Sequence, residues 1–346
     1  MLTDSEIAKL TPFLESVIPG ARALRIERHF RIHGGASRVT YSLDVVYEAH
    51  NGPVSRGLIL RRDPEDSLIE TERALEFAAY QSFHGRAPVP APIALVEDAA
   101  LIGKPFFVME RIEGGAAASP FQVDPYADHR ERVAREFFRI LGKIAQVDPT
   151  ETALARIASM PEPSQCWKRE LDYWAGVIAE DALEPQPIVA AAIRRLRANP
   201  PPAPQRLSVI HGDYRSGNFL HDGTGSILAV LDWEMAHIGD AHEDLAWALD
   251  PLWSHFKDDH ALGAIPRAEA IALWEEASGL RFDADAFRWW SLFASVKGMA
   301  IWLSSSRAYA DGKNTDPVLA FSGWYCTVRH DDIIARRLAA APRGGI

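Results

Sequence analysis

The sequence predicts an α+β protein in which a small β-rich lobe precedes a larger α-helical lobe. Up to about residue 112, apolar residues alternate over short segments that are separated by turn residues, a pattern typical of strands. Beyond that point they recur every three or four residues over longer segments, which is typical of helices. We expect the first lobe to span residues 1–112 and the second to span residues 113–346.

In the first lobe, the turn sequence Asn51-Gly52-Pro53 separates two expected strands. One helix is expected where Leu68, Leu75, Ala78 and Ala79 recur at helical spacing, and a proline-rich segment, residues 87–92, ends it. Residues 110–115 read as the connector between the lobes. The expected elements are strands at residues 40–47, 57–61 and 106–109 and a helix at residues 66–83.

The second lobe is predicted to be mostly helical. An apolar stripe at Val133, Phe137 and Ile140 continues to Ile144 and marks one amphipathic helix. A proline-rich loop, residues 199–204, leads into a strand-loop-strand whose last strand is expected at residues 227–231. Further helices are expected at residues 167–179, 188–196, 268–278, 284–305 and 317–338, and another is expected to begin at Asp244.

Composition excludes some classes of partner. The net charge of −10 argues against non-specific binding to nucleic acid or to an anionic membrane surface. Cys166 and Cys326 are far apart and have no metal-type spacing, which favours a reducing compartment. Residues 1–10 do not resemble a signal peptide, and no apolar run is long enough to span a membrane. The chain is therefore expected to be cytoplasmic.

The strongest chemical signal is a set of three oxygen-bearing side chains near the expected strand-loop-strand. Asp213 and Asn218 are five positions apart, and Asp232 follows the apolar run at residues 227–231. A loop followed by a hairpin would bring all three around one point. Phosphoryl transfer from ATP needs such a set: a carboxylate that accepts the proton of the attacking hydroxyl, and hard oxygen ligands for Mg²⁺.

The order of motifs strengthens this interpretation. His211, Asp213 and Asn218 have the spacing of a kinase catalytic loop. Singly, such residues are often turn or cap residues, which does not explain their order. The constellation His211-Gly212-Asp213, Asn218, Asp232-Trp233-Glu234 and Gly239-Asp240 with Asp244-Leu245-Ala246 resembles the aminoglycoside phosphotransferase family. It is especially similar to the branch that includes the kinase-like domains of some acyl-CoA dehydrogenases.

The resemblance implies a protein-kinase-like two-lobed fold and a kinase that uses ATP and Mg²⁺ to phosphorylate a hydroxyl group of a small molecule. It implies that Asp213 is the base and that Asn218 and Asp232 hold the metal. Arg215 is a further catalytic candidate that would contact the γ-phosphate; the alternative is a salt bridge to a neighbouring acid. His211 is expected to be structural.

Other residues are expected around the nucleotide. Gly34, Gly35 and Ser37 precede the first expected strand pair, where glycines let the backbone approach a phosphate. Arg61 stands where the family has a strand lysine, and strand alternation allows only one of Arg61 and Arg62 to face inward. The acid expected beside Arg61 is Glu72, with Glu70 and Glu76 as alternatives.

The segment from Phe106 to Gly114 resembles the family's hinge. By the resemblance, the Glu110 carbonyl and the Ile112 amide would bind the adenine edge, with Met109 at the back of the pocket. A buried strand that meets a loop would give the same sequence.

Asp240 and Asp244 are expected to brace the catalytic loop by accepting backbone amides, and Asp244 is also a candidate helix cap. Glu234 has two interpretations: support of the metal site, or exposure to solvent.

All ten tryptophans lie at or beyond Trp167. The resemblance implies that the last helices form the acceptor pocket. The carboxylates expected near that pocket, Asp250, Asp258 and Asp259, are few for a polycationic acceptor. A partly apolar hydroxyl compound is therefore favoured, and an acyl-CoA derivative, a macrolide-like molecule and a choline-type amine stay open. Two other functions remain as alternatives: a nucleotide-binding regulatory pseudokinase and a protein kinase.

Overall fold

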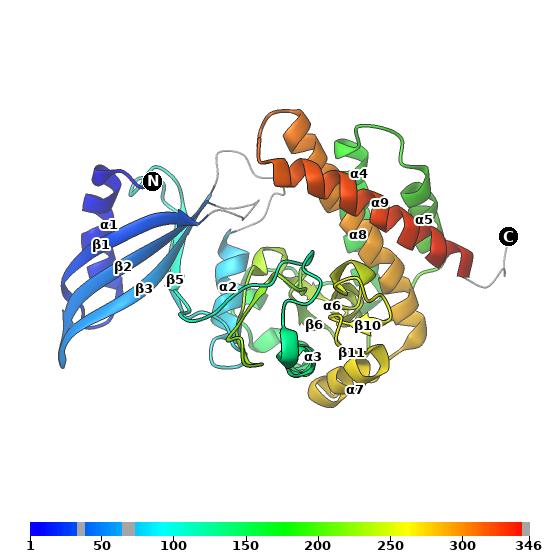
Figure 1. The fold of residues 1–346 in the computed structure, drawn as a ribbon, viewed down its shortest axis with the longest axis horizontal. Helices are drawn as coiled ribbons and strands as arrows, with labels where there is room; N and C mark the ends of the chain where they lie inside the picture. Colours follow the sequence, from blue (N-terminus) through cyan, green and yellow to red (C-terminus); the bar gives the residue numbers. More distant parts are fainter. Residues whose placement is uncertain (33–38, 64–72, 341–346) are drawn as a thin grey trace.

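The computed structural model describes residues 1–32, 39–63 and 73–340. Figure 1 shows a β-sheet with one helix beside it at one end of the molecule and a larger helical body at the other. The sheet ends at Glu110, and the later strands are short pairs between helices. The predicted arrangement, a β-rich part followed by a larger helical part, is confirmed. The boundary at residue 112 stays a prediction.

The sheet has five antiparallel strands in the order β1-β2-β3-β5-β4. Alternate residues of each strand face opposite sides. On one side Leu58 and Val108 pack against helix α1, while on the other Ile59 and Phe107 belong to the core that includes α2 and much of the helical lobe. The elements are α1 (Asp4–Val17), β1 (Arg22–Ile32), β2 (Val39–Ala49), β3 (Gly52–Arg62), α2 (Arg73–Phe83), β4 (Pro92–Val96) and β5 (Phe106–Glu110).

The sequence analysis missed α1, β1 and β4. Helix α1 begins with a capping box in which Thr3 and Glu6 bond each other's backbone amides, a signal that the sequence displayed. Strand β1 carries five arginine and histidine side chains that obscure the alternation. Residues 33–38 connect β1 to β2, so the Gly34-Gly35 segment follows the first strand instead of preceding the first pair.

Seven helices in the described residues form most of the second lobe. The expected helices are confirmed, although several are longer than predicted and α6 begins at His242, two positions before Asp244. The helices are α3 (Arg130–Gln146), α4 (Cys166–Asp181), α5 (Pro187–Ala198), α6 (His242–Ala248), α7 (Arg267–Ser278), α8 (Ala284–Ala310) and α9 (Pro317–Ala340). Short 3-10 helices lie at Ala127–His129, Pro149–Glu151, Leu154–Arg156, Pro163–Gln165, Trp233–Met235 and Pro251–Trp253.

Three short strand pairs lie between these helices. Two of them position the predicted site residues, because one ends at the His211 turn and the other is the hairpin flanked by Asn218 and Asp232. The pairs are β6 (Ser208–Ile210) with β9 (His237–Gly239), β7 (Phe219–His221) with β8 (Ile227–Val230), and β10 (His260–Ala261) with β11 (Ile265–Pro266).

Aromatic side chains fill the second lobe. Trp233, Trp247, Trp253, Trp274 and Trp290 are fully buried, which is the more common fate of tryptophan. Both cysteines are buried free thiols. Across the described ranges, none of the helices has both the length and the apolar character that crossing a membrane requires.

Helices α8 and α9 pack closely along their length, and Gly298 is one of the residues that allows it. A Cβ atom at Gly298 would overlap the imidazole ring of His330 on α9. That ring is held in place, because Trp302 donates its indole N–H to His330 Nδ1 at 3.0 Å and Asp250 Oδ1 lies 3.2 Å from Nε2. The ring therefore has little freedom to move aside.

We expect Gly298→Ala to lower the free energy of unfolding by about 1–3 kcal/mol, the usual range for overpacking in a core. Gly176 is the matched control, since it is an exposed helical glycine with open space around its Cα atom. Gly176→Ala should leave stability unchanged or raise it by up to about 1 kcal/mol. Urea denaturation measures both, and equal stability of the two variants would contradict the close packing of α8 on α9.

Candidate active site

Residues 211–213, called the catalytic turn because Asp213 is the predicted base, are fixed by a buried carboxylate. Asp244, on α6, accepts the backbone amides of His211 at 2.6 Å and Gly212 at 2.9 Å. Burial raises the pKa of Asp244 to about 6, and Glu243 adds to the effect, while the two amides act in the opposite direction. Gly212 has a φ of 84°, and a Cβ there would overlap the Met235 carbonyl, so glycine is required.

Of the two residues predicted to brace the turn, Asp244 does so and Asp240 does not. Asp244 braces the turn as expected, but it lies within the first turn of α6, whose N-cap residue is Ala241. Asp240 instead accepts the His242 amide at 2.9 Å and the Trp290 indole at 2.8 Å. It therefore ties the start of α6 to α8 and does not contact the catalytic turn directly.

His211 is a buried structural residue. Its Nε2 lies 2.9 Å from the Leu231 carbonyl, and its Nδ1 accepts the Asp213 amide at 3.1 Å. These partners require a neutral ring with the proton on Nε2. Burial lowers the pKa of His211 to about 3, so the ring stays neutral and joins the turn to the hairpin.

The Asp213 carboxylate receives three donors. Trp247 Nε1 donates to Oδ1 at 2.9 Å, Asn218 Nδ2 donates to Oδ2 at 2.6 Å, and Arg215 Nε lies 3.0 and 3.1 Å from the two oxygens. Burial raises the pKa of Asp213, and Arg215 opposes that rise. The sequence analysis did not single out Trp247, because nothing in its local sequence distinguishes it from a core tryptophan.

Arg215 forms an ion pair with Asp213, the predicted base. The ion pair with a neighbouring acid, one of the two alternatives for Arg215, is present, and that acid is Asp213. The guanidinium also lies 4.9 Å from the ring centre of Trp253. Arg215 lines the same cavity as Asp213.

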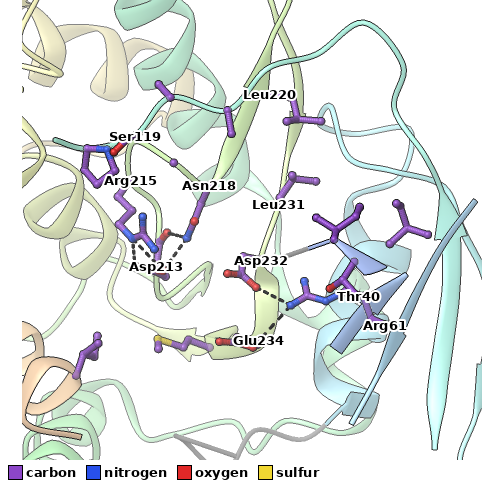
Figure 2. Close-up of a pocket in the computed structure, with 18 of the residues that line it drawn as sticks. Thr40, Arg61, Ser119, Asp213, Arg215, Asn218, Leu220, Leu231, Asp232 and Glu234 are labelled. Carbon is purple, nitrogen blue, oxygen red and sulfur yellow. Dashed lines mark hydrogen bonds and ion pairs between the residues drawn. The ribbon is translucent and has the colours of Figure 1, made fainter. Parts of the chain in front are cut away.

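The hairpin brings Asn218 and Asp232 together. The Leu231 amide bonds the Asn218 carbonyl at 2.8 Å, so Asp232 follows directly after the residue paired with Asn218. Asp232 has a left-handed backbone, with φ of 68° and ψ of 57°, which ends the strand sharply. Figure 2 shows Asp213, Asn218 and Asp232 beside one another along one cavity.

Arg61 joins the sheet to this hairpin. Its Nη1 lies 2.6 Å from Glu76 Oε1 on α2, and its Nη2 lies 2.9 Å from Asp232 Oδ1. Glu234 Oε2 is 3.9 Å from the same Nη2, and Glu234 is buried, which excludes the solvent-facing interpretation. Burial opposes ionisation of Asp232, but Arg61 outweighs it and lowers the pKa of this carboxyl group.

The neighbouring arginine faces the other side of the sheet. Arg62 contacts Glu6 on α1 at 2.6 Å and the Tyr41 hydroxyl at 2.8 Å. Glu72 lies outside the described residues, as do Gly34, Gly35 and Ser37. The α2 carboxylate that contacts Arg61 is that of Glu76, which the sequence analysis had ranked only as an alternative to Glu72.

One cavity has a volume of about 1000 Å³ and is lined by the charged and amide side chains described above. These are Arg61, Asp213, Arg215, Asn218, Asp232 and Glu234. At the end near the sheet it is lined by Ile59, Met109, Glu110 and Ile112 from the strands and the predicted hinge. At the other end the described lining residues are mostly apolar or hydroxyl-bearing and include no carboxylate. That second end is formed by Ala117, Ala118, Ser119, Pro120, Trp247, Ile301, Trp302, Ser304, Ser305, Val318, Leu319 and Ser322.

The carboxylates predicted near the acceptor have other partners. Asp250 is buried and pairs with His330 at 3.2 Å and Arg337 at 3.0 Å. Asp258 pairs with Arg329, and Asp259 lies next to His260. None of the three is among the described residues that line the cavity. Of the tryptophans, Trp247 and Trp302 line it.

Comparison with known proteins agrees with this geometry. The model of the phosphotransferase enzyme family (APH) matches residues 31–280. Acyl-CoA dehydrogenase family member 10 of Mus musculus is 31% identical over 204 residues, which is 56% of this chain but only 18% of that protein. The chain thus corresponds to a small part of this relative.

Two solved structures are similar over nearly the whole chain. A Ralstonia eutropha protein described provisionally as an aminoglycoside phosphotransferase has a TM-score of 0.73 at 20% identity, covering 96% of this chain and 98% of that one. A thermostable mutant of aminoglycoside phosphotransferase APH(4)-Ia, in complex with AMP-PNP and hygromycin B, has a TM-score of 0.58 at 16% identity, covering 96% and 99%. At this identity the likeness confirms the kinase-like fold. Together with the family model, it shows that the chain belongs to the phosphotransferase enzyme family.

Proposed function

We propose that this protein is a small-molecule kinase that transfers the γ-phosphoryl group of MgATP to a hydroxyl group. The observation that supports it best is the meeting of Asp213, Asn218 and Asp232 along one cavity. Arg61 adds a buried cation beside this set. Phosphoryl transfer depends mainly on positioning and charge neutralisation, and these groups supply both.

The nucleotide would occupy the end of the cavity that the sheet lines. Ile59 and Met109 offer apolar surface to a base, and the backbone at Glu110 and Ile112 would bind its edge. Arg61 would contact phosphate oxygens with the same guanidinium that contacts Asp232. Gly34, Gly35 and Ser37 remain proposed phosphate contacts by their place in the sequence.

The donor set fits Mg²⁺. Asn218 donates hydrogen bonds from Nδ2 to Asp213, so its side-chain oxygen Oδ1 can bind a metal ion. The Asp232 carboxylate follows directly after Leu231, which pairs with Asn218. Oxygen donors of this kind are what Mg²⁺ prefers. When bound, the ion would neutralise phosphate charge. Asn218 and Asp232 would hold it.

Asp213 would orient the acceptor hydroxyl and receive its proton as the bond to phosphorus forms. Trp247 and Asn218 fix the direction of the carboxylate. Arg215 would move from Asp213 toward the transferred group and stabilise its charge, since Arg215 lines the same cavity. The proposed base is therefore oriented by hydrogen bonds that it accepts from Trp247 and Asn218.

The acceptor would be a hydroxyl compound with an apolar body. Trp302, Ile301 and Leu319 supply apolar surface, and Ser304, Ser305 and Ser322 supply hydroxyl groups. A polycationic acceptor needs several carboxylates, and the described lining has none at this end. Amino sugars with many ammonium groups are therefore disfavoured.

We expect Asp213→Asn to lower the rate of phosphoryl transfer by about 10²–10⁴-fold, because the amide cannot accept the hydroxyl proton. Affinity for MgATP should change little. Asp222→Asn is the matched control: it makes the same exchange in the exposed turn of the same hairpin and should keep full activity. An ATP-consumption screen over neutral and cationic hydroxyl compounds provides the assay.

The same screen separates the two alternatives. Wild-type turnover by Asp213→Asn would contradict the assignment of the base. Nucleotide binding without Mg²⁺-dependent ATP consumption would favour a pseudokinase, and phosphorylation of generic protein substrates would favour a protein kinase.

We expect Arg61→Lys to weaken MgATP binding by about tenfold, because an ammonium group cannot reach Glu76 and Asp232 with two separate nitrogens. Arg62→Lys, on the same strand but facing α1, should bind MgATP like the wild type. Equilibrium titration with MgAMP-PNP measures both affinities. Equal affinity of the two variants would rule out the role of Arg61.

A further inference from the structure

A cluster of buried and partly buried charges contacts the catalytic turn and is not part of the described cavity lining. It consists of Lys297 on α8, Glu243 on α6, His237 on β9 and Glu170 on α4. Lys297 and Glu243 are almost completely inaccessible to solvent. Burying a lysine carries a large desolvation cost, so its position needs specific partners.

The cluster has the donor types of a metal site, since single atoms of Glu170, His237 and Glu243 lie within 4.8 Å of one another. Its charges are already balanced, however. Burial opposes protonation of His237, but Glu170 and Glu243 outweigh it and raise the pKa of His237 to about 9. Two carboxylates therefore face two cations, with Lys297 Nζ 3.1 Å from Glu243 Oε1. A divalent ion would have to displace one of them.

Lys297 also bonds the catalytic turn itself. Its ammonium group donates to the Gly212 carbonyl oxygen. That oxygen belongs to the peptide group whose nitrogen is the Asp213 amide, and this amide bonds His211 Nδ1 at 3.1 Å. The peptide immediately before the proposed base is thus held at both ends, by Lys297 on one side and by His211 on the other.

The same ammonium group contacts the tryptophan that bonds the base. Lys297 Nζ lies 5.6 Å from the ring centre of Trp247, whose indole N–H donates to Asp213 Oδ1 at 2.9 Å. It lies at a similar distance, 5.5 Å, from the ring centre of Trp174. Lys297 therefore touches both the backbone that precedes Asp213 and the ring that orients its carboxylate.

We propose that Lys297 is a positioning residue for phosphoryl transfer, which fixes Asp213 through the Gly212 carbonyl and through Trp247. This inference rests on the proposed function, since it assumes that Asp213 is the base. Glu243 serves as the countercharge that allows a lysine to be buried there. A lysine that only stabilised the fold would need Glu243 but not these two contacts with the catalytic turn.

The decisive variant replaces the charged pair by a neutral one. Lys297→Met alone leaves Glu243 with one cation fewer and is expected to lose stability. Lys297→Met combined with Glu243→Gln removes both charges and leaves His237 paired with Glu170. We expect this double variant to recover most of the melting temperature but to hydrolyse MgATP, without acceptor, at least about tenfold more slowly than the wild type. Its KM for MgATP should stay within about threefold, since the contacts at the sheet end are unchanged.

A second pair of variants tests the contact through Trp247 without disturbing buried charge. Trp247→Phe keeps an aromatic ring but removes the N–H donor to Asp213, and we expect about a tenfold lower rate of MgATP hydrolysis. Trp174→Phe is the matched control, because its ring flanks the same ammonium group while its indole nitrogen has no hydrogen-bond partner among the described residues. It should retain the wild-type rate. Equal rates for the two variants would overturn the inference.

A measurement that needs no nucleotide separates this inference from the proposed function. In protein labelled with ¹⁵N-tryptophan, ten indole N–H signals are expected, and Trp247→Phe identifies the one from Trp247. In the double variant Lys297→Met, Glu243→Gln, the Trp247 signal should shift and its N–H should exchange faster with solvent. In Trp174→Phe the signal should stay in place. An unchanged Trp247 signal in this double variant would overturn the positioning role of Lys297. If the wild-type protein hydrolysed no MgATP, the proposed function would fail, and this comparison would still decide whether Lys297 positions the turn.

Discussion

The structure depends on buried Arg61, which links three separate parts of the chain. One guanidinium group contacts Glu76 on α2 and Asp232 after β8, and it is itself carried by β3. Removing it would leave Glu76 as a buried acid without this partner, a change that typically costs about 3–5 kcal/mol. The geometry of the sheet, the helix and the hairpin is thus coupled to the position of one proposed metal ligand.

Cations and carboxylates are organised in two layers around the cavity. Nearest to it, Arg61 and Arg215 contact Asp232 and Asp213. Behind the catalytic turn, Lys297 balances Glu243, and Asp244 binds the backbone amides of the turn. Asp213 accepts hydrogen bonds from Trp247 and Asn218, and Asp232 pairs with Arg61. Both carboxylates are therefore held in place before a substrate arrives, which is what the proposed catalysis by positioning requires.

The sequence predicted that Asp213, Asn218 and Asp232 would lie together, because they are close in the chain and their spacing follows from one turn and one hairpin. It favoured Glu72 over Glu76 as the partner of Arg61, because a helical pattern alone does not distinguish two acids four positions apart. The contact of Glu76 with Arg61 became visible only in the structure, whereas Glu72 lies outside the described residues. Lys297 and Trp247 were missed because their roles arise from the packing of α8 and α6 on the turn. The ion pairs of Asp250 could not be predicted because its partners, His330 and Arg337, come from a helix that begins 67 positions later, at Pro317.

The central claim is that Asn218 and Asp232 share one divalent ion with a nucleotide beside Asp213. Crystals grown with AMP-PNP and Mn²⁺ test it most directly, since anomalous scattering locates the ion. We expect the anomalous peak in the cavity, at about 2.1 Å from Asn218 Oδ1 and from an Asp232 oxygen, the range for hard octahedral cations. A nucleotide bound elsewhere, or an ion that contacts neither side chain, would contradict the account.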